Sequence, residues 1–188
     1  AARVPRNGRV GLIATRGTVD SRAYDDALQA VPGVELFSQA CPRFVELAER
    51  GVTTGAEVLD VAEEYLAPIK AAGVDTLILG CTHYPLLVGP ISYVMGEDVP
   101  LVTSSDETAK DVYRALARKN LLRGSDAPEP RHDFRSTGDP EAFSVLARRF
   151  LGPEVAAVER IAFASSESGA RVVPSDVSPL PATLQGSA

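Results

Sequence analysis

A cysteine and a histidine stand one residue apart in the stretch LILGCTHYPLL, which begins at Leu77. Cys81 and His83 follow a continuous apolar run and Gly80, a residue that lets the backbone turn. A thiol beside an imidazole can attack a carbonyl or move a proton, with the histidine as acid, base or orienting group. Cysteine is also among the most buried residue types. The stretch therefore fits a catalytic thiol at a strand end, and equally the plain end of a buried strand.

A second group of polar residues follows the first apolar run, RVGLIAT. Thr15 and Thr18 lie directly after it, and in an open α/β sheet ligands bind at the carboxyl ends of the parallel strands. The two threonines also suit loop and helix N-cap positions. The other cysteine, Cys41, precedes a proline and has no chemically suggestive neighbour, which favours simple packing.

The sequence offers no pattern for a metal or a nucleotide cofactor. A structural zinc site needs four ligands, and Cys81 with His83 is the only close pair of cysteine and histidine in the chain. Neither Gly-x-Gly-x-x-Gly nor a Walker sequence occurs. We therefore expect neither a metal site nor a nucleotide cofactor.

Charge and composition exclude several classes of partner. The net charge of −6 argues against a sequence-independent nucleic-acid binder, which would need a basic face. No apolar run approaches the ~20 residues that span a bilayer. Two cysteines are too few for a disulfide framework, which indicates a reducing compartment, and we expect a cytoplasmic protein.

Apolar runs alternate with helical patterns along most of the chain, which predicts an α/β fold with mostly parallel strands. The run VDTLILG lacks alternation and is typical of a strand covered on both faces. Ser104 and Glu107 form a candidate capping box. The expected strands are 9–15, 34–40, 74–80 and 99–104, and the expected helices are 19–31, 56–72, 86–95 and 104–121.

A polar, proline-containing linker over 122–130 precedes a third unit with a short strand and a helix. Asp139 as N-cap and Pro140 at the first position begin that helix. Its expected buried face consists of Phe143, Leu146, Ala147 and Phe150. The final residues are rich in Ser, Pro, Ala and Gly, and we expect them to be disordered.

The stretch LILGCTHYPLL resembles the C-terminal catalytic motif of the glutamate racemase family, within the aspartate/glutamate racemase superfamily. The resemblance extends from Gly8 to about Gly152. It includes, in the family's order, RVGLIATRGTVDSRAY, ACPRFVELAERG, SSDETAKDVYRAL and STGDPEAFSVLARRFLG.

This resemblance implies a cofactor-independent interconversion of L- and D-glutamate that supplies D-glutamate for peptidoglycan. Two thiols act on opposite faces of the α-carbon, because a planar carbanion is inverted only if the proton leaves one face and arrives on the other. The resemblance also implies a small-molecule substrate and a homodimer for the full-length protein. It assigns proton transfer to Cys81, assistance to His83, support of that histidine to Glu49, and substrate contacts to Thr82, His83, Thr15 and Thr18.

The sequence departs from the family in one respect. The family's Asp-Ser-Gly segment, Tyr-Gly pair and Cys-Asn motif do not occur, and the context of Cys41 matches a non-catalytic segment. The chain thus resembles the C-terminal two thirds of a racemase, with little activity alone. We expect one nearly whole α/β lobe over 1–99, a segment over 100–161 that completes the other lobe, and a disordered tail over 162–188. Exposed apolar surface is expected beyond Pro100.

Two alternatives stay open. Cys81 with His83 would also suit a cysteine-nucleophile hydrolase or transferase, in which the histidine activates the thiol for attack on a carbonyl. A non-catalytic binding domain that keeps the fold is the other reading.

Overall fold

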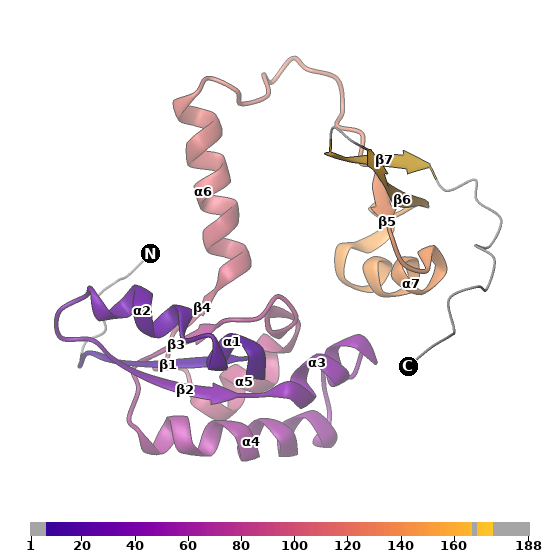
Figure 1. Cartoon of the computed structure of the whole chain (residues 1–188). Coiled ribbons are helices and arrows are strands. Elements are labelled where there is room, and N and C mark those ends of the chain that lie inside the picture. Colours follow the sequence, from indigo (N-terminus) through magenta and orange to yellow (C-terminus); the bar gives the residue numbers. More distant parts are fainter. Residues whose placement is uncertain (1–6, 167–168, 175–188) are drawn as a thin grey trace, which may run out of the picture. The chain divides into compact units, whose positions relative to one another are not determined.

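The chain forms two compact units, one up to Ala127 and one from Pro128 (Figure 1). The computed structural model describes residues 7–166 and 169–174. In the first unit a four-stranded sheet has the order β2-β1-β3-β4, and every pairing is parallel. The predicted α/β class with parallel strands is confirmed. The strands are β1 (Arg9–Ala14), β2 (Glu35–Ala40), β3 (Thr76–Leu79) and β4 (Leu101–Thr103).

Helices connect these strands and cover the sheet. Figure 1 shows α4 and α5 on one face and α1 and α2 on the other. They are α1 (Arg16–Asp20), α2 (Ala23–Gln29), α3 (Pro42–Glu49), α4 (Ala56–Ala71), the 3-10 turn η1 (Tyr84–Leu87), α5 (Val88–Met95) and α6 (Ser104–Arg118).

The hydrophobic core lies between the sheet and the helices α3, α4 and α5. One side of α4 is apolar at helical spacing, so the helix buries it against the strands. Phe44 of α3 is fully buried and packs edge-on against Tyr65 and Tyr84, with ring centroids 5.4 Å apart in both pairs. The buried side chains from α4 are Val58, Val61, Ala62, Leu66 and Ile69.

The opposite face of the sheet is only partly covered. In β3, Leu77 and Leu79 are fully buried, whereas Thr76 and Ile78 on the other face are half-buried. The helices α1 and α2 are short and bury none of their residues. The prediction that this strand is covered on both faces is therefore wrong within the described part of the chain.

The predicted helix over 19–31 is interrupted. Ser21 donates a hydrogen bond from its hydroxyl to the carbonyl of Thr18 (2.7 Å) and accepts one from the amide of Ala23 (3.4 Å). Such local bonds compete with helical ones. Arg22 then adopts a left-handed conformation with φ 55°, and two short helices replace the expected single one.

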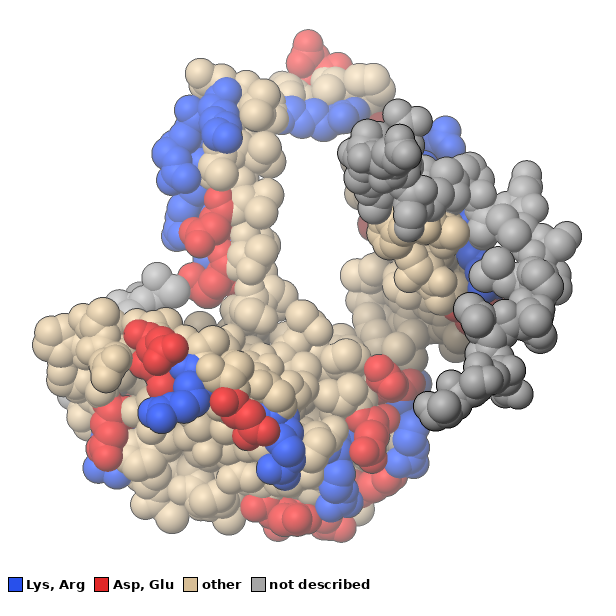
Figure 2. Space-filling model, in the orientation of Figure 1, with Lys and Arg blue, Asp and Glu red and all other residues tan. Residues whose placement is uncertain are grey.

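The N-cap of α6 lies one residue before the predicted one. Thr103, not Ser104, is the N-cap, and its hydroxyl accepts from the amide of Asp106 at 3.2 Å. None of the residues of α6 is buried, and Figure 2 shows charged residues along one side of it and uncharged ones along the other. Its large exposed apolar side chains are Val112, Tyr113 and Leu116.

The first compact unit extends past the expected lobe boundary at residue 99, because β4 pairs with β3 in the same sheet. Which residues complete a second lobe in a longer protein stays a prediction. Exposed apolar side chains are indeed frequent beyond Pro100. Outside α6 they include Leu121, Leu122, Phe143, Val145, Leu151 and Phe163.

The second unit is a small sheet with one helix. β5 (Phe134–Ser136) pairs in parallel with β6 (Val158–Ser166), which pairs antiparallel with β7 (Gly169–Pro174). Between β5 and β6 lie α7 (Pro140–Leu151) and the 3-10 turn η2 (Gly152–Glu154). The tail expected to be disordered from residue 162 therefore includes β-structure, since backbone pairing continues to Pro174. Residues 175–188 lie outside the described part.

The cap predicted for α7 is confirmed, but its buried face is smaller than predicted. The carboxylate of Asp139 accepts from the amide of Glu141 at 2.9 Å, and Pro140 is the first helical residue. Of the four apolar positions expected to be buried, only Ala147 is, and Phe143 is 40% exposed. The reason is that the small sheet offers little surface to cover this helix.

Cys41 lies in the core at the start of α3. Its side chain is fully buried, in agreement with the packing role that the sequence favours. Its thiol lies 3.6 Å from the carbonyl oxygen of Gln39. Burial raises the pKa of this thiol from 9.0 to about 12, because a thiolate would lose its hydration.

We predict that Gly80→Ala destabilises the chain by about 1–3 kcal/mol, because the added methyl overpacks the core. A Cβ at this position would lie 2.7 Å from Cδ1 of Leu12 and 3.3 Å from Cβ of Ala14. Urea unfolding measures the change. Gly89→Ala is the matched control: it lies in α5 with nothing within 4 Å, so it should be neutral or stabilising. Equal stability of both variants would contradict the packing argument.

The raised pKa of Cys41 predicts a loss of stability at alkaline pH. Its contribution is fully present below about pH 9 and is lost as pH rises toward 12, because the thiol ionises first in the unfolded chain. This group alone should lower the free energy of unfolding by about 1 kcal/mol between about pH 9 and 10. Urea unfolding of Cys41→Ala should show that component removed. An identical pH slope in the parent chain would disprove it.

Candidate active site

The loop after β3 carries the chemistry that the sequence singles out. The amide of Gly80 donates to the carbonyl of Ile13 at 2.8 Å, so the ends of β1 and β3 lie level at the same edge of the sheet. Cys81 follows with only 9% of its surface exposed. Its sulfur lies 3.7 Å from Nδ1 of His83. That these two side chains act together in catalysis stays a prediction.

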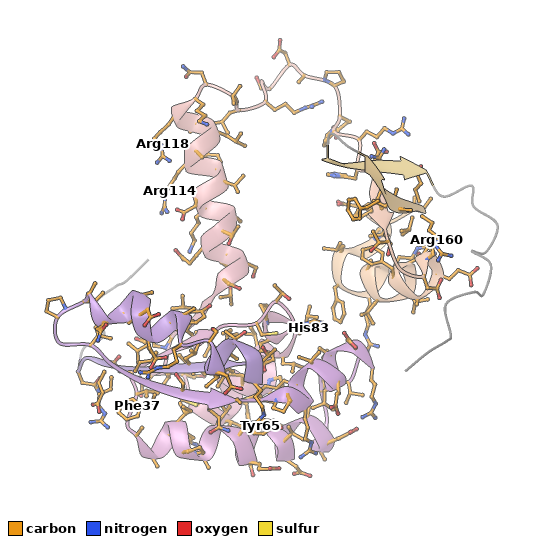
Figure 3. All side chains as sticks on the ribbon, in the orientation of Figure 1. Phe37, Tyr65, His83, Arg114, Arg118 and Arg160 are labelled. Carbon is orange, nitrogen blue, oxygen red and sulfur yellow. The ribbon has the colours of Figure 1, made fainter. Side chains whose placement is uncertain are left out.

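A carboxylate from another element meets the same histidine. Nε2 of His83 lies 3.3 Å from Oε1 of Glu49, the last residue of α3. The side chains of His83 and Glu49 are 32% and 59% exposed. Figure 3 labels His83 in the loop after β3. Thiol, imidazole and carboxylate thus form one continuous row of polar atoms that is buried at its sulfur end and open to solvent at its carboxylate end.

This row can exchange a proton with a small molecule. When Glu49 accepts a hydrogen bond from Nε2–H, Nδ1 of neutral His83 is left as an acceptor that can take the proton of the Cys81 thiol. A protonated His83 can instead donate from Nδ1 to the thiolate. The carboxylate orients the ring in both cases, and the His83 side chain is 32% exposed, which lets protons pass to water.

The predicted substrate-contact residues lie at the same strand ends. Thr82 is exposed between Cys81 and His83. The hydroxyl oxygens of Thr15 and Thr18 are 2.9 Å apart, and that of Thr15 accepts from the amide of Thr18 at 3.4 Å. Thr15 is therefore the N-cap of α1, as one sequence interpretation held. Contact of Thr15, Thr18 and Thr82 with a substrate stays a prediction.

Tyr84 follows the predicted site directly, and no sequence pattern singles it out. Its side chain is fully buried, and its hydroxyl donates to the carbonyl of Cys41 at 2.8 Å. Burial raises the pKa of Tyr84 above its usual range, with smaller contributions from Cys41, Cys81 and Tyr65. An aromatic residue after a polar motif is commonly a core residue, so no sequence pattern distinguishes this hydroxyl from an ordinary one.

Over residues 7–166 and 169–174, no group of three or more His, Cys, Asp or Glu side chains could hold a metal ion. No helix in the described part of the chain is both long and apolar enough to cross a membrane.

Known proteins match this chain over most of its length. Residues 1–120 match the family model described as Asp/Glu/Hydantoin racemase. A curated glutamate racemase of Parafrankia sp. is 58% identical over 158 residues, which are 84% of this chain and 57% of the relative. This chain thus spans less than two thirds of the length of that relative.

Solved structures agree. A glutamate racemase isoform from Bacillus anthracis is similar with a TM-score of 0.77 at 35% identity, over 85% of this chain and 59% of that one. The glutamate racemase of Francisella tularensis in complex with D-glutamate has a TM-score of 0.74 at 33% identity, with the same coverage. The resemblance that the sequence motifs indicate is confirmed, and the chain belongs to the Asp/Glu/Hydantoin racemase family.

Proposed function

We propose that this chain carries one half of the active site of a glutamate racemase, with Cys81 as one of its two proton-transfer thiols. The observation that carries the proposal is the row from the Cys81 sulfur through the His83 ring to the Glu49 carboxylate. It lies at the carboxyl edge of a parallel sheet, where α/β proteins bind ligands. The named relatives, which are glutamate racemases, support the choice of glutamate.

The proposed reaction moves one proton in each direction. The Cys81 thiolate removes the α-proton of one enantiomer, the α-carbon becomes planar, and a second thiol delivers a proton to the opposite face. For the reverse direction the roles exchange. His83 accepts or returns the thiol proton, and Glu49 holds the ring. Thr82, Thr15 and Thr18 are proposed to contact the substrate, and no cofactor takes part.

Cys41 is excluded as the second thiol. It is fully buried in the core, and its pKa of about 12 keeps it protonated at neutral pH. Cys41 and Cys81 are the only cysteines of the chain. The second thiol is therefore proposed to come from a part of a longer protein that this chain does not include, or from another chain.

Exposed apolar surface beyond Pro100 supports the same division. The apolar side of α6, with Val112, Tyr113 and Leu116, is exposed, and no residue of this helix is buried. Such a surface is costly to leave in water. We propose that residues 104–161, which follow β4, complete a second lobe in the longer protein, and that the chain alone has little activity.

The physiological setting follows from the reaction. D-glutamate is proposed to supply peptidoglycan synthesis, and a catalytic thiol must stay reduced, which favours the cytoplasm. A homodimer is proposed for the full-length protein.

A second candidate deserves a direct test, because the sulfur-to-Nδ1 distance of 3.7 Å also fits a thiol activated by histidine for attack on a carbonyl. The two reactions leave different products. A hydrolase or transferase forms a covalent acyl adduct on Cys81, visible as a mass increase. A racemase instead exchanges the α-proton of glutamate with solvent and leaves no adduct.

We predict that Cys81→Ala greatly slows α-proton exchange. The chain is combined with the remaining part of the Parafrankia relative, and deuterium incorporation into glutamate in heavy water is followed by mass spectrometry. Loss of the proton-transfer thiol should lower the rate by about 10²–10⁴-fold. Cys41→Ala is the matched control and should retain the rate once folded. Equal loss in both variants, or an unaffected Cys81→Ala, would refute the assignment.

A further prediction concerns the carboxylate. Glu49→Gln should lower the exchange rate by about tenfold, because the amide removes the negative charge that orients and stabilises the protonated His83 ring. Glu46→Gln is the control: it is exposed on the same helix and makes no ion pair with His83. The same assay reads both variants. Similar rates for Glu49→Gln and Glu46→Gln would show that the carboxylate contact has no function.

A further inference from the structure

The loop that carries Cys81 and His83 contacts α3 at both ends of that helix. At its last residue, Glu49 meets the ring of His83 at 3.3 Å. At its first turn, the carbonyl of Cys41 accepts two hydrogen bonds, one from the amide of Phe44 at 3.2 Å and one from the hydroxyl of Tyr84 at 2.8 Å. The helix is rigid between these points, so two contacts define where the loop sits.

Tyr84 is bonded both to the residue that carries the thiol and to the start of this helix. Its backbone amide donates to the carbonyl of Cys81 at 3.3 Å, while its hydroxyl reaches across to Cys41. The bond lies in the core, because Cys41 and Tyr84 are both fully buried. A buried hydrogen bond of this kind is costly to break, since neither group can turn to water.

We propose that Tyr84 is the positioning residue for the Cys81–His83 pair, and that its hydroxyl holds the loop on α3 in the register at which Glu49 meets His83. The contribution of Tyr84 to catalysis rests on the proposed racemase function. Its contribution to holding the loop on α3 does not depend on that function. Tyr84 touches no reacting atom. It acts through its chain neighbour His83 and through the hydrogen bond from its amide to the carbonyl of Cys81.

A second tyrosine provides a control that is nearly matched. Tyr65 of α4, labelled in Figure 3, packs edge-on against the same Phe44 ring at the same 5.4 Å. Its hydroxyl also meets the first turn of α3, where it accepts from the amide of Arg43 at 3.4 Å. It belongs to a different helix and makes no bond to the loop. Removing its hydroxyl therefore perturbs the start of α3 without releasing the loop.

The test compares Tyr84→Phe with Tyr65→Phe in the full 188-residue chain by amide hydrogen exchange. In Tyr84→Phe the backbone amide at position 84, which bonds to the carbonyl of Cys81, should lose about tenfold in protection. The reference is the amide of Leu77 in β3, which should not change, because only the loop opens. Tyr65→Phe should leave that ratio unchanged. Equal losses at both amides in Tyr84→Phe, or the same loss in Tyr65→Phe, would overturn the proposal.

A spectroscopic readout reports on the site itself. The chain has two histidines, His83 and His132, so ring ¹⁵N signals can be assigned with one variant of each. Tyr84→Phe should move the His83 signals and leave those of His132, and Tyr65→Phe should move neither. Unmoved His83 signals in a folded Tyr84→Phe chain would overturn the positioning role.

One measurement needs no variant, in case Tyr84→Phe does not fold. In an equal mixture of light and heavy water, the ¹³C NMR signal of the Tyr84 Cζ should split in two, one for the protonated and one for the deuterated hydroxyl, because a buried, bonded hydroxyl exchanges slowly. A single averaged signal would overturn the proposal. None of these readouts requires substrate. Failure of α-proton exchange would therefore count against the proposed function alone, whereas failure here would count against Tyr84 alone.

Discussion

The level pairing of β1 and β3 is the constraint on which the site depends. The amide of Gly80 bonds to the carbonyl of Ile13, so the two strands end together and their following residues leave the sheet at one edge. Glycine suits this position, because a Cβ would lie 2.7 Å from Cδ1 of Leu12 and the buried side chain would have to shift. The tight contact brings the Cys81 loop close to the sheet and leaves the thiol nearly buried.

The site is then assembled by tertiary contacts between elements distant in the sequence. The thiol and imidazole come from one loop, whereas the carboxylate and the carbonyl that anchors Tyr84 come from opposite ends of α3. A short amphipathic helix packed through Phe44 is well suited to this, because its ends are held at a constant separation by its backbone hydrogen bonds. The order of the site therefore derives from the core beneath it.

The core is larger on one face of the sheet than on the other, although β1 is buried on both. Helices α3, α4 and α5 bury one face of the sheet, while Ile78 on the other face is only half-buried and no residue of α6 is buried. A chain that spans 57% of the length of a relative would show this pattern if further structure covered those surfaces. The two buried-face predictions that failed, for β3 and for α7, both overestimated coverage. A hydrophobic pattern reports which residues avoid water, and it does not report whether the partner surface belongs to the same chain.

The sequence by itself determined the α/β class, the strand that leads to Cys81, the helix begun by Asp139 and Pro140, and the membership of the racemase family. These depend on local signals: apolar runs, capping residues and a contiguous motif. Only the tertiary structure decided that His83 meets Glu49, that Cys41 lies sealed in the core, and that the hydroxyl of Tyr84 bonds to the carbonyl of Cys41. Each of those contacts joins residues at least 34 positions apart or depends on surrounding packing. No local pattern encodes such a meeting, because the fold, and not the spacing along the chain, sets the distance between the two groups.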